Sequence, residues 1–159
     1  MRGSLVHKLL FPTAALAVLL SVSPAAFGDS LEACLAEAWP QNQIICLSGI
    51  AIEAGDPTLC LRSGEPAVRW RCVANYAEKA GDAAPCAILP DDDLEVPGVA
   101  GELCRGHLAI SWREPALCIE LATPNLADSC LLQLVQLGED KALCGRIENE
   151  ILADSCLEN

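Results

Sequence analysis

Ten cysteines carry most of the reactive chemistry that this 159-residue sequence offers. Thiols bind zinc, form redox-active pairs or oxidise to structural disulfides, and their spacing separates these uses. The cysteines are Cys34, Cys46, Cys60, Cys72, Cys86, Cys104, Cys118, Cys130, Cys144 and Cys156. No two of them are closer than 12 positions. This spacing excludes the C-x-x-C motif of redox dithiols and of haem c attachment, and it differs from the close doublets of zinc modules. We therefore expect five disulfides.

An acidic cluster is the one local group of residues with metal-binding character. It consists of Asp91, Asp92, Asp93 and Glu95, in a segment flanked by prolines. Calcium takes carboxylate oxygens, but the cluster lacks the D-x-D-x-D-G alternation of an EF-hand loop. A solvated acidic loop is the preferred interpretation, so we predict no metal or cofactor site and retain these four residues as weak candidates. Because loops often carry function, a partner would be sought there first.

Other side chains with catalytic or binding potential are few. His107 lies three residues after Cys104, with no serine, cysteine or acid placed by the sequence to form a catalytic set with it. No glycine-rich phosphate loop or dinucleotide fingerprint occurs. We therefore expect a protein that is not an enzyme, with a hydrolase using His107 as a minor alternative. The tryptophans, Trp39, Trp70 and Trp112, either cover gaps in a thin core or form a binding hot spot.

The first 28 residues have the layout of a secretory signal peptide. Arg2 and Lys8 precede a mostly apolar run at residues 9–22, and small residues then permit cleavage after Gly28. The run is about 14 residues long, whereas a membrane anchor needs roughly 20. A lipoprotein signal ending at Cys34 is a poorer alternative, because Glu32 is charged and lipidation would leave nine cysteines. We predict a cleaved leader at residues 1–28, a single domain at 29–159, and a secreted or periplasmic location, where disulfides persist.

The cysteines define an internal repeat. Their separations alternate between 12 and 14, so that the unit is C-x11-C-x13 with a period of 26. A single interval of 18 separates Cys86 from Cys104, which marks an insertion of six residues. Self-similarity at a fixed period indicates a repeat architecture. The five units lie near residues 30–55, 56–81, 82–113, 114–139 and 140–159.

Each unit reads as two helices. Four residues before each first cysteine stands a candidate N-cap, and these are Ser30, Asp56, Asp82, Glu114 and Asp140, of which Glu114 is the poorest. Apolar residues at the second cysteine and at one, four and five positions after it form one face of a longer helix. Gly55, Gly81 and Gly138 end three of these helices. Turn residues around Pro40, Pro66 and Pro124 separate the two helices. The predicted fold is all-α, with five helical hairpins stacked as a short α-solenoid or a curled bundle.

The turns also predict which cysteines pair. Cys34 and Cys46 each lie six residues from Pro40, and Cys118 and Cys130 each lie six residues from Pro124. An antiparallel hairpin places such positions opposite each other, at a separation a disulfide can span. The alternative pairing across the x13 intervals is less symmetric and leaves Cys34 to reach Cys156. The predicted pairs are Cys34–Cys46, Cys60–Cys72, Cys86–Cys104, Cys118–Cys130 and Cys144–Cys156.

The cysteine-anchored segments at residues 56–60 and 114–118, Asp-Pro-Thr-Leu-Cys and Glu-Pro-Ala-Leu-Cys, resemble those of small, uncharacterised, secreted cysteine-rich helical-repeat proteins. The resemblance is one of pattern, and it implies a fold without an activity. Twin-cysteine helical hairpins of the mitochondrial coiled-coil-helix type are similar in idea, but they carry two C-x9-C pairs in each hairpin. The x11 spacing and the single cysteine per helix place this chain outside that family.

Charge narrows the class of partner. The chain has a net charge of −12, and removal of residues 1–28 takes away Arg2 and Lys8 and no acid, which gives −14. Such acidity disfavours nucleic acid and anionic membranes. It is compatible with a cationic protein partner, although solubility alone explains it. We therefore expect a non-enzymatic extracytoplasmic interaction or structural module. The alternative is a carrier of a small ligand or divalent cation, using the Asp91–Glu95 loop or the solenoid groove.

Overall fold

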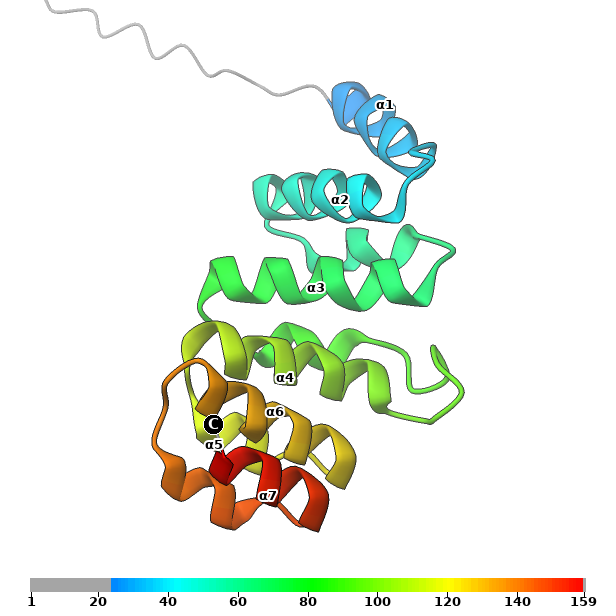
Figure 1. Cartoon of the computed structure of the whole chain (residues 1–159). Helices are drawn as coiled ribbons and strands as arrows, with labels where there is room; N and C mark the ends of the chain where they lie inside the picture. The colour runs from blue at the N-terminus through cyan, green and yellow to red at the C-terminus, as the bar shows by residue number, and fades with distance from the viewer. Residues whose placement is uncertain (1–23, 159) are drawn as a thin grey trace, which may run out of the picture.

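A computed structural model describes residues 24–158, and all of their regular structure is helical (Figure 1). The elements are α1 (Pro24–Leu35), α2 (Pro40–Ala54), η1 (Pro57–Arg62), α3 (Pro66–Ala80), η2 (Ala84–Ile88), α4 (Val99–Trp112), α5 (Pro115–Ile119), α6 (Pro124–Gln136), η3 (Lys141–Arg146) and α7 (Glu150–Glu158), where η denotes a 3₁₀-helix. The all-α prediction is confirmed for this part of the chain. Most of the predicted leader, residues 1–23, lies outside the described residues, and the predicted cleavage site after Gly28 falls within α1.

The elements form five hairpins that stack in chain order. Each hairpin has a short first element (the A element: α1, η1, η2, α5 or η3) and a longer second one (the B helix: α2, α3, α4, α6 or α7). The principal contacts join elements of one hairpin or of two consecutive hairpins. Figure 1 shows the N-terminal hairpin at one end of this stack and the C-terminal hairpin at the other. This nearest-neighbour arrangement is that of a short α-solenoid.

Five disulfides join the A element to the B helix within each hairpin, and the predicted pairing is confirmed. The bridges are Cys34–Cys46, Cys60–Cys72, Cys86–Cys104, Cys118–Cys130 and Cys144–Cys156, with Cα–Cα distances of 5.4–5.7 Å. The insertion after Cys86 lengthens one A–B loop and leaves its bridge in place. Short helices are marginal alone, so closing each loop stabilises a hairpin by about 3 kcal/mol in the chain-entropy model.

The A elements are shorter and tighter than expected, because three of the five are 3₁₀-helices. Asp56 and Asp140 cap theirs by accepting hydrogen bonds from the amides of Thr58 and Ala142, both at 2.9 Å. The predicted cap at Asp82 is displaced by one residue, because Ala83 is the N-cap of η2, although Asp82 still accepts from the amide of Ala84 at 2.9 Å. Glu114 occupies the N-cap position of α5 without a side-chain bond. The predicted cap at Ser30 is wrong, because α1 begins at Pro24 and runs through this position.

The B helices begin earlier than the apolar pattern predicted. Pro40, Pro66 and Pro124 are the first residues of α2, α3 and α6 rather than turn residues. Proline is favoured at this position because it lacks only an amide proton that the first turn leaves unpaired, and its φ angle suits a helix. Each second cysteine of these helices therefore lies in mid-helix rather than near the helix start.

The predicted glycine ends are confirmed for two B helices. Gly55 and Gly81 have φ angles of +65° and +68°, and in each case the next amide bonds back to the helix, from Asp56 to Ala51 and from Asp82 to Ala77. Gly138, with a φ of +99°, lies one residue beyond Leu137, the C-cap of α6. At the end of α4 the left-handed position is taken by Arg113, with a φ of +56°. Each helix end leads directly into the next A element.

The core follows the cysteine face of the B helices and divides into two clusters. One cluster covers hairpins one to three, and the other covers the end of α4 with hairpins four and five. Leu108 belongs to the first cluster and its neighbour Ala109 to the second, so both clusters meet on α4. Nine of the ten cysteines are buried, and Cys46 is partly exposed. The disulfide sulfurs thus supply part of a core that contains few aromatic rings.

Candidate functional site

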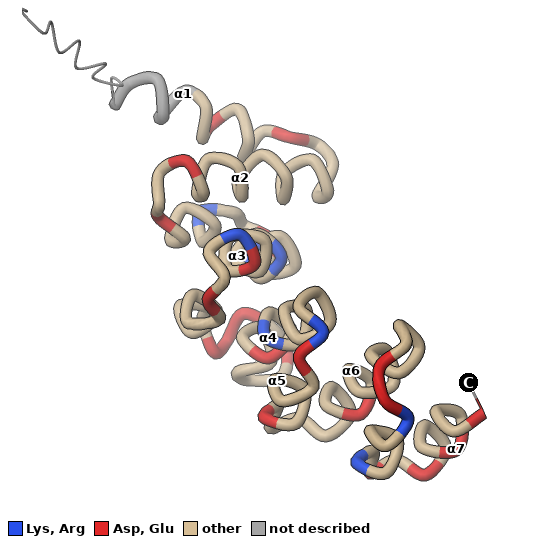
Figure 2. The backbone as a smooth tube through the Cα atoms, turned by 90° about the vertical axis from the view of Figure 1, so that its left-hand side faces the viewer, with Lys and Arg blue, Asp and Glu red and all other residues tan. Residues whose placement is uncertain are grey.

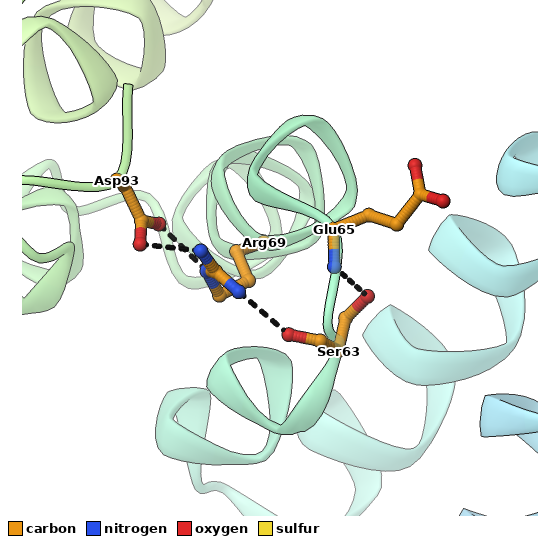
Figure 3. A network of polar contacts seen from close by, with 4 residues as sticks. All are labelled: Ser63, Glu65, Arg69 and Asp93. Carbon is orange, nitrogen blue, oxygen red and sulfur yellow. Dashed lines mark hydrogen bonds and ion pairs between the residues drawn. The ribbon is translucent and has the colours of Figure 1, made fainter. Parts of the chain in front are cut away.

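The acidic loop proves to be a structural contact between hairpins two and three. Arg69 on α3 donates two hydrogen bonds to the carboxylate of Asp93, one of them from Nε at 2.7 Å, and a third from Nη1 to the Ser63 carbonyl at 2.8 Å (Figure 3). The side chains of Arg69 and Asp93 are only 16% and 6% exposed. The hydrogen bond with Asp93 raises the pKa of Arg69 above its ordinary value. Asp93 is thus held by an arginine and turned away from solvent.

The other three acids of the loop, Asp91, Asp92 and Glu95, stay at or near the surface. Among residues 24–158, no three histidine, cysteine, aspartate or glutamate side chains are grouped so that they could hold a metal ion. With Asp93 engaged by Arg69, the loop presents fewer carboxylates to a cation than its sequence suggested.

Buried polar side chains at the start of the B helices make the same kind of contact at the other junctions. On α4, Glu102 accepts hydrogen bonds from the amides of Ala122 and Thr123 at 3.2 and 2.9 Å. On α6, Asp128 accepts from the amides of Glu148 and Asn149, both at 2.9 Å. In each case a carboxylate holds the A–B turn of the following hairpin, some twenty residues later, by two of its backbone N–H groups.

The first junction uses an amide in place of a carboxylate. The Ser63 hydroxyl donates to Gln43 Oε1 at 2.8 Å and accepts from the Glu65 amide at 3.2 Å, while Gln43 Nε2 donates to the Leu35 carbonyl at 3.0 Å. Each of the four junctions therefore has one clamp residue on the preceding B helix, namely Gln43, Arg69, Glu102 and Asp128. Sequence reasoning missed all four, because the contacts join segments that only the stack brings together.

One signal for the clamp residues is nevertheless present in the sequence. Leu-Ala-Asp-Ser-Cys-Leu occurs twice, at residues 126–131 and at residues 152–157, one period apart. The first copy contains the clamp residue Asp128, which is 2% exposed. The equivalent residue of the second copy, Asp154, is exposed. An acid repeated two positions before the second cysteine could have marked this position.

A groove runs across the B helices near the middle of the stack. Residues of α2, α3 and α4, among them Ile44, Trp70 and His107, line one cavity of about 320 Å³. A second cavity of about 320 Å³ shares Trp70, Arg71 and His107 with the first and continues over α4 and α6 to Leu126. We call these two adjoining cavities the Trp70 groove. It joins four successive B helices on one surface.

The centre of the groove combines an aromatic ring with a cation. The Arg71 guanidinium lies 5.2 Å from the centroid of the Trp70 ring, a cation–π distance. Figure 2 shows acidic residues spread along the whole stack, with far fewer Lys and Arg. Glu102 is the one carboxylate that lines the groove, and both its oxygens accept backbone hydrogen bonds. In a chain of net charge −12, exposed Arg71 is thus the cation that the groove presents to solvent.

His107 does not form a catalytic triad with the neighbouring Ser111 and Glu78. Its Nε2 lies 3.4 Å from one Glu78 oxygen, and the Ser111 hydroxyl donates to the other. The carboxylate therefore lies between the hydroxyl and the imidazole, whereas a triad places the imidazole in the middle to activate the hydroxyl. His107 and Glu78 are 43% and 41% exposed. This geometry supports a polar contact at the edge of the groove.

The three tryptophans have different surroundings. Trp112 and Trp70 are half-buried and pack against the first core cluster, as expected for side chains that cover a thin core. Trp70 also lines the groove. Trp39, at the turn before α2, is 71% exposed.

Comparison with protein families, with curated proteins and with solved structures found no match to this chain. In the part of the chain that the structure describes, no helix has both the length and the apolar character needed to cross a membrane. The five disulfides indicate that the protein folds in an oxidising environment.

Proposed function

We propose that this chain is an extracytoplasmic binding module that holds an extended segment of another protein in the Trp70 groove. The observation that carries the proposal is the meeting of two cavities at Trp70, Arg71 and His107, on helices that follow one another in the stack. Stacked hairpins commonly bind partners along such extended surfaces. The proposal involves no catalytic step.

The lining of the groove indicates the chemistry of the partner. Trp70, Leu103 and Ile110 offer apolar contact, whereas Arg71 offers a cation that is exposed to solvent. Tryptophan and arginine are among the residue types enriched at binding hot spots. A matching segment presents an apolar side chain beside a carboxylate. The groove thus favours an acidic partner, although the net charge of the whole chain suggested a cationic one.

The disulfides contribute to binding through rigidity. The B helices that carry Trp70 and His107 are each bridged to their A elements, by Cys60–Cys72 and Cys86–Cys104. A surface that is already ordered loses little conformational entropy when a ligand binds. This rigidity gives the cysteines a supporting role in the function without participation in any chemistry.

A small-ligand carrier is the second candidate, and the size of the cavities favours it. Each of the two holds about 320 Å³, near the lower end of the range for small-molecule sites, roughly 300–1,000 Å³. Such a ligand would use the same Trp70–Arg71 pair, so a tryptophan substitution affects both candidates equally. They differ in whether a peptide suffices for binding.

Selection from a displayed library of random peptides on the immobilised, oxidised chain tests the proposal. Enriched peptides are expected to combine an aromatic or aliphatic residue with Asp or Glu. Trp70→Ala and Arg71→Glu are each expected to weaken their binding at least about tenfold. Trp39→Ala is the matched control, since Trp39 is exposed and lines neither cavity, and it is expected to leave affinity unchanged. Failure to enrich any peptide, or enriched peptides that still bind Trp70→Ala, would contradict the proposal.

A further inference from the structure

The two ends of the stack carry complementary halves of the contact that joins its interior hairpins. At the junction between hairpins four and five, Asp128 holds the amides of Glu148 and Asn149, and Leu131 on the same face is 2% exposed. Hairpin five repeats residues 126–131 as residues 152–157, which places Asp154 and Leu157 in the equivalent positions. Asp154 is exposed and forms no hydrogen bond or ion pair within residues 24–158. Leu157 is 60% exposed.

Apolar exposure at this end exceeds that of one side chain. Ile151, also on α7, is 80% exposed, the highest value among the exposed large apolar residues described. The exposed face of α7 thus has the apolar and acidic composition of an interior junction.

The opposite end of the stack presents a turn of the kind that such a face holds. In hairpin four, Thr123 is the extended N-cap of α6, with φ −85° and ψ 109°, and proline follows it. In hairpin one, Trp39 is the extended N-cap of α2, with φ −107° and ψ 124°, and again proline follows. Both N-cap carbonyls accept the amide four residues later, at 3.1 and 3.0 Å. The two turns therefore have the same backbone form.

The turns differ in what their amides bind. The amides of Ala122 and Thr123 donate to Glu102 of the preceding hairpin. The equivalent amides of Ala38 and Trp39 donate no hydrogen bond to any residue in the described part of the chain. Hairpin one therefore offers two unpaired donors beside an exposed indole, and hairpin five offers an unpaired carboxylate beside exposed Leu157.

We propose that the chain assembles head to tail, with the Asp154 face of one copy binding the turn at residues 36–39 of a second copy. Asp154 accepts the amides of Ala38 and Trp39, and the Trp39 indole covers apolar surface of α7. The contact repeats the interior junctions, so a second copy extends the stack as a further hairpin would. Because the two surfaces lie at opposite ends of the stack (Figure 1), the contact is heterologous and propagates into linear oligomers.

Charge affects the strength of this contact in a defined way. Two copies of net charge −12 repel each other at a distance, and exposed Glu37 adds a carboxylate to the turn whose neutral amides Asp154 meets. Salt screens the repulsion and affects the short hydrogen bonds less. Association is therefore expected to strengthen as salt rises, with a dissociation constant of about 10–100 µM at physiological ionic strength for so small an interface.

Sedimentation velocity on the purified, oxidised chain over a range of concentrations tests the proposal. The expected result is a series of dimers, trimers and longer species that grows with concentration. Asp154→Ala and Trp39→Asp are each expected to weaken association at least about tenfold. Aspartate is a good N-cap, so the second change preserves the start of α2. Glu53→Ala removes an exposed acid from α2 and is the control, expected to leave association unchanged.

Mixing the two variants gives the sharpest result. Each variant alone is expected to stay monomeric at concentrations where the unaltered chain associates, because one of its two ends binds at least about tenfold more weakly. Together, the intact end of Trp39→Asp binds the intact end of Asp154→Ala, so that the mixture forms heterodimers and nothing larger. A chain that stays monomeric at about 1 mM, ten times the weakest expected dissociation constant, would overturn the proposal. Oligomers that persist in both variants, or a series that stops at a symmetric dimer, would overturn it too.

Discussion

At the scale of single residues, Asp128 and Asp154 occupy the same place in a repeated segment but lie in different environments. Comparing them measures how much a clamp residue contributes to stability. Asp128→Ala removes a buried carboxylate that accepts from two backbone amides, and it is expected to lower the free energy of unfolding by about 2–3 kcal/mol. Asp154→Ala is expected to change it by less than about 0.5 kcal/mol at dilute concentration, because Asp154 is exposed. Urea denaturation of both variants under oxidising conditions compares them. Equal effects would show that the Asp128 contacts do not stabilise the junction.

Arg113 carries a second residue-scale prediction, since it has a left-handed backbone where Gly55 and Gly81 end their helices. Its side chain offsets this strain by donating to the Leu137 carbonyl at 2.8 Å. Arg113→Ala loses the bond and keeps the strain, so it is expected to destabilise the fold by about 1 kcal/mol. Arg113→Gly loses both the hydrogen bond and the strain, so it is expected to leave the stability of the fold nearly unchanged. Thermal melting of the two variants checks the order, and a less stable glycine variant would contradict this explanation.

At the scale of elements, the disulfide of each hairpin is expected to stabilise mainly that hairpin and its neighbours. Replacing Cys144 and Cys156 by alanine opens hairpin five, whose α7 spans nine residues and has little buried surface beyond the bridge. Hydrogen exchange is expected to show lost protection in η3 and α7, with α2 and α3 unchanged. The same replacement of Cys60 and Cys72 is expected to affect hairpins one to three. Loss of protection along the whole chain in both variants would argue against nearest-neighbour stacking.

The elements also show how far the sequence alone could lead. Disulfide pairing and the caps at Asp56 and Asp140 were predicted correctly, because they depend on residues within one hairpin, at most about a dozen positions apart. The start of the B helices was predicted too late in the sequence, because a proline such as Pro40 is favoured both in a turn and at the first position of a helix. The clamp residues and the Trp70 groove depend on how hairpins stack. The sequence therefore did not predict the contact of Arg69 with Asp93, and Asp93 was interpreted as part of a solvated acidic loop.

At the scale of the whole molecule, the two core clusters predict two cooperative blocks that share α4. Leu47 and Leu134 are both fully buried, one in each cluster. Truncation of either to alanine is expected to cost about 2–5 kcal/mol. Native-state hydrogen exchange is expected to place the loss for Leu47→Ala in hairpins one to three and that for Leu134→Ala in hairpins four and five. If both variants instead lowered protection equally along the described chain, the two clusters would unfold as one unit.

The most direct test of the central claim, a stack of hairpins that are each closed by their own disulfide, is a tryptic digest of the non-reduced protein with free thiols blocked, analysed by mass spectrometry. Lys79, Arg105, Arg113 and Lys141 separate the hairpins into distinct peptides. Residues 80–105 and 114–141 are predicted to appear as single peptides, each with one internal disulfide, and 142–146 to be joined to 147–159. Peptides 80–105 and 114–141 joined to each other through Cys104 and Cys118 would contradict the account.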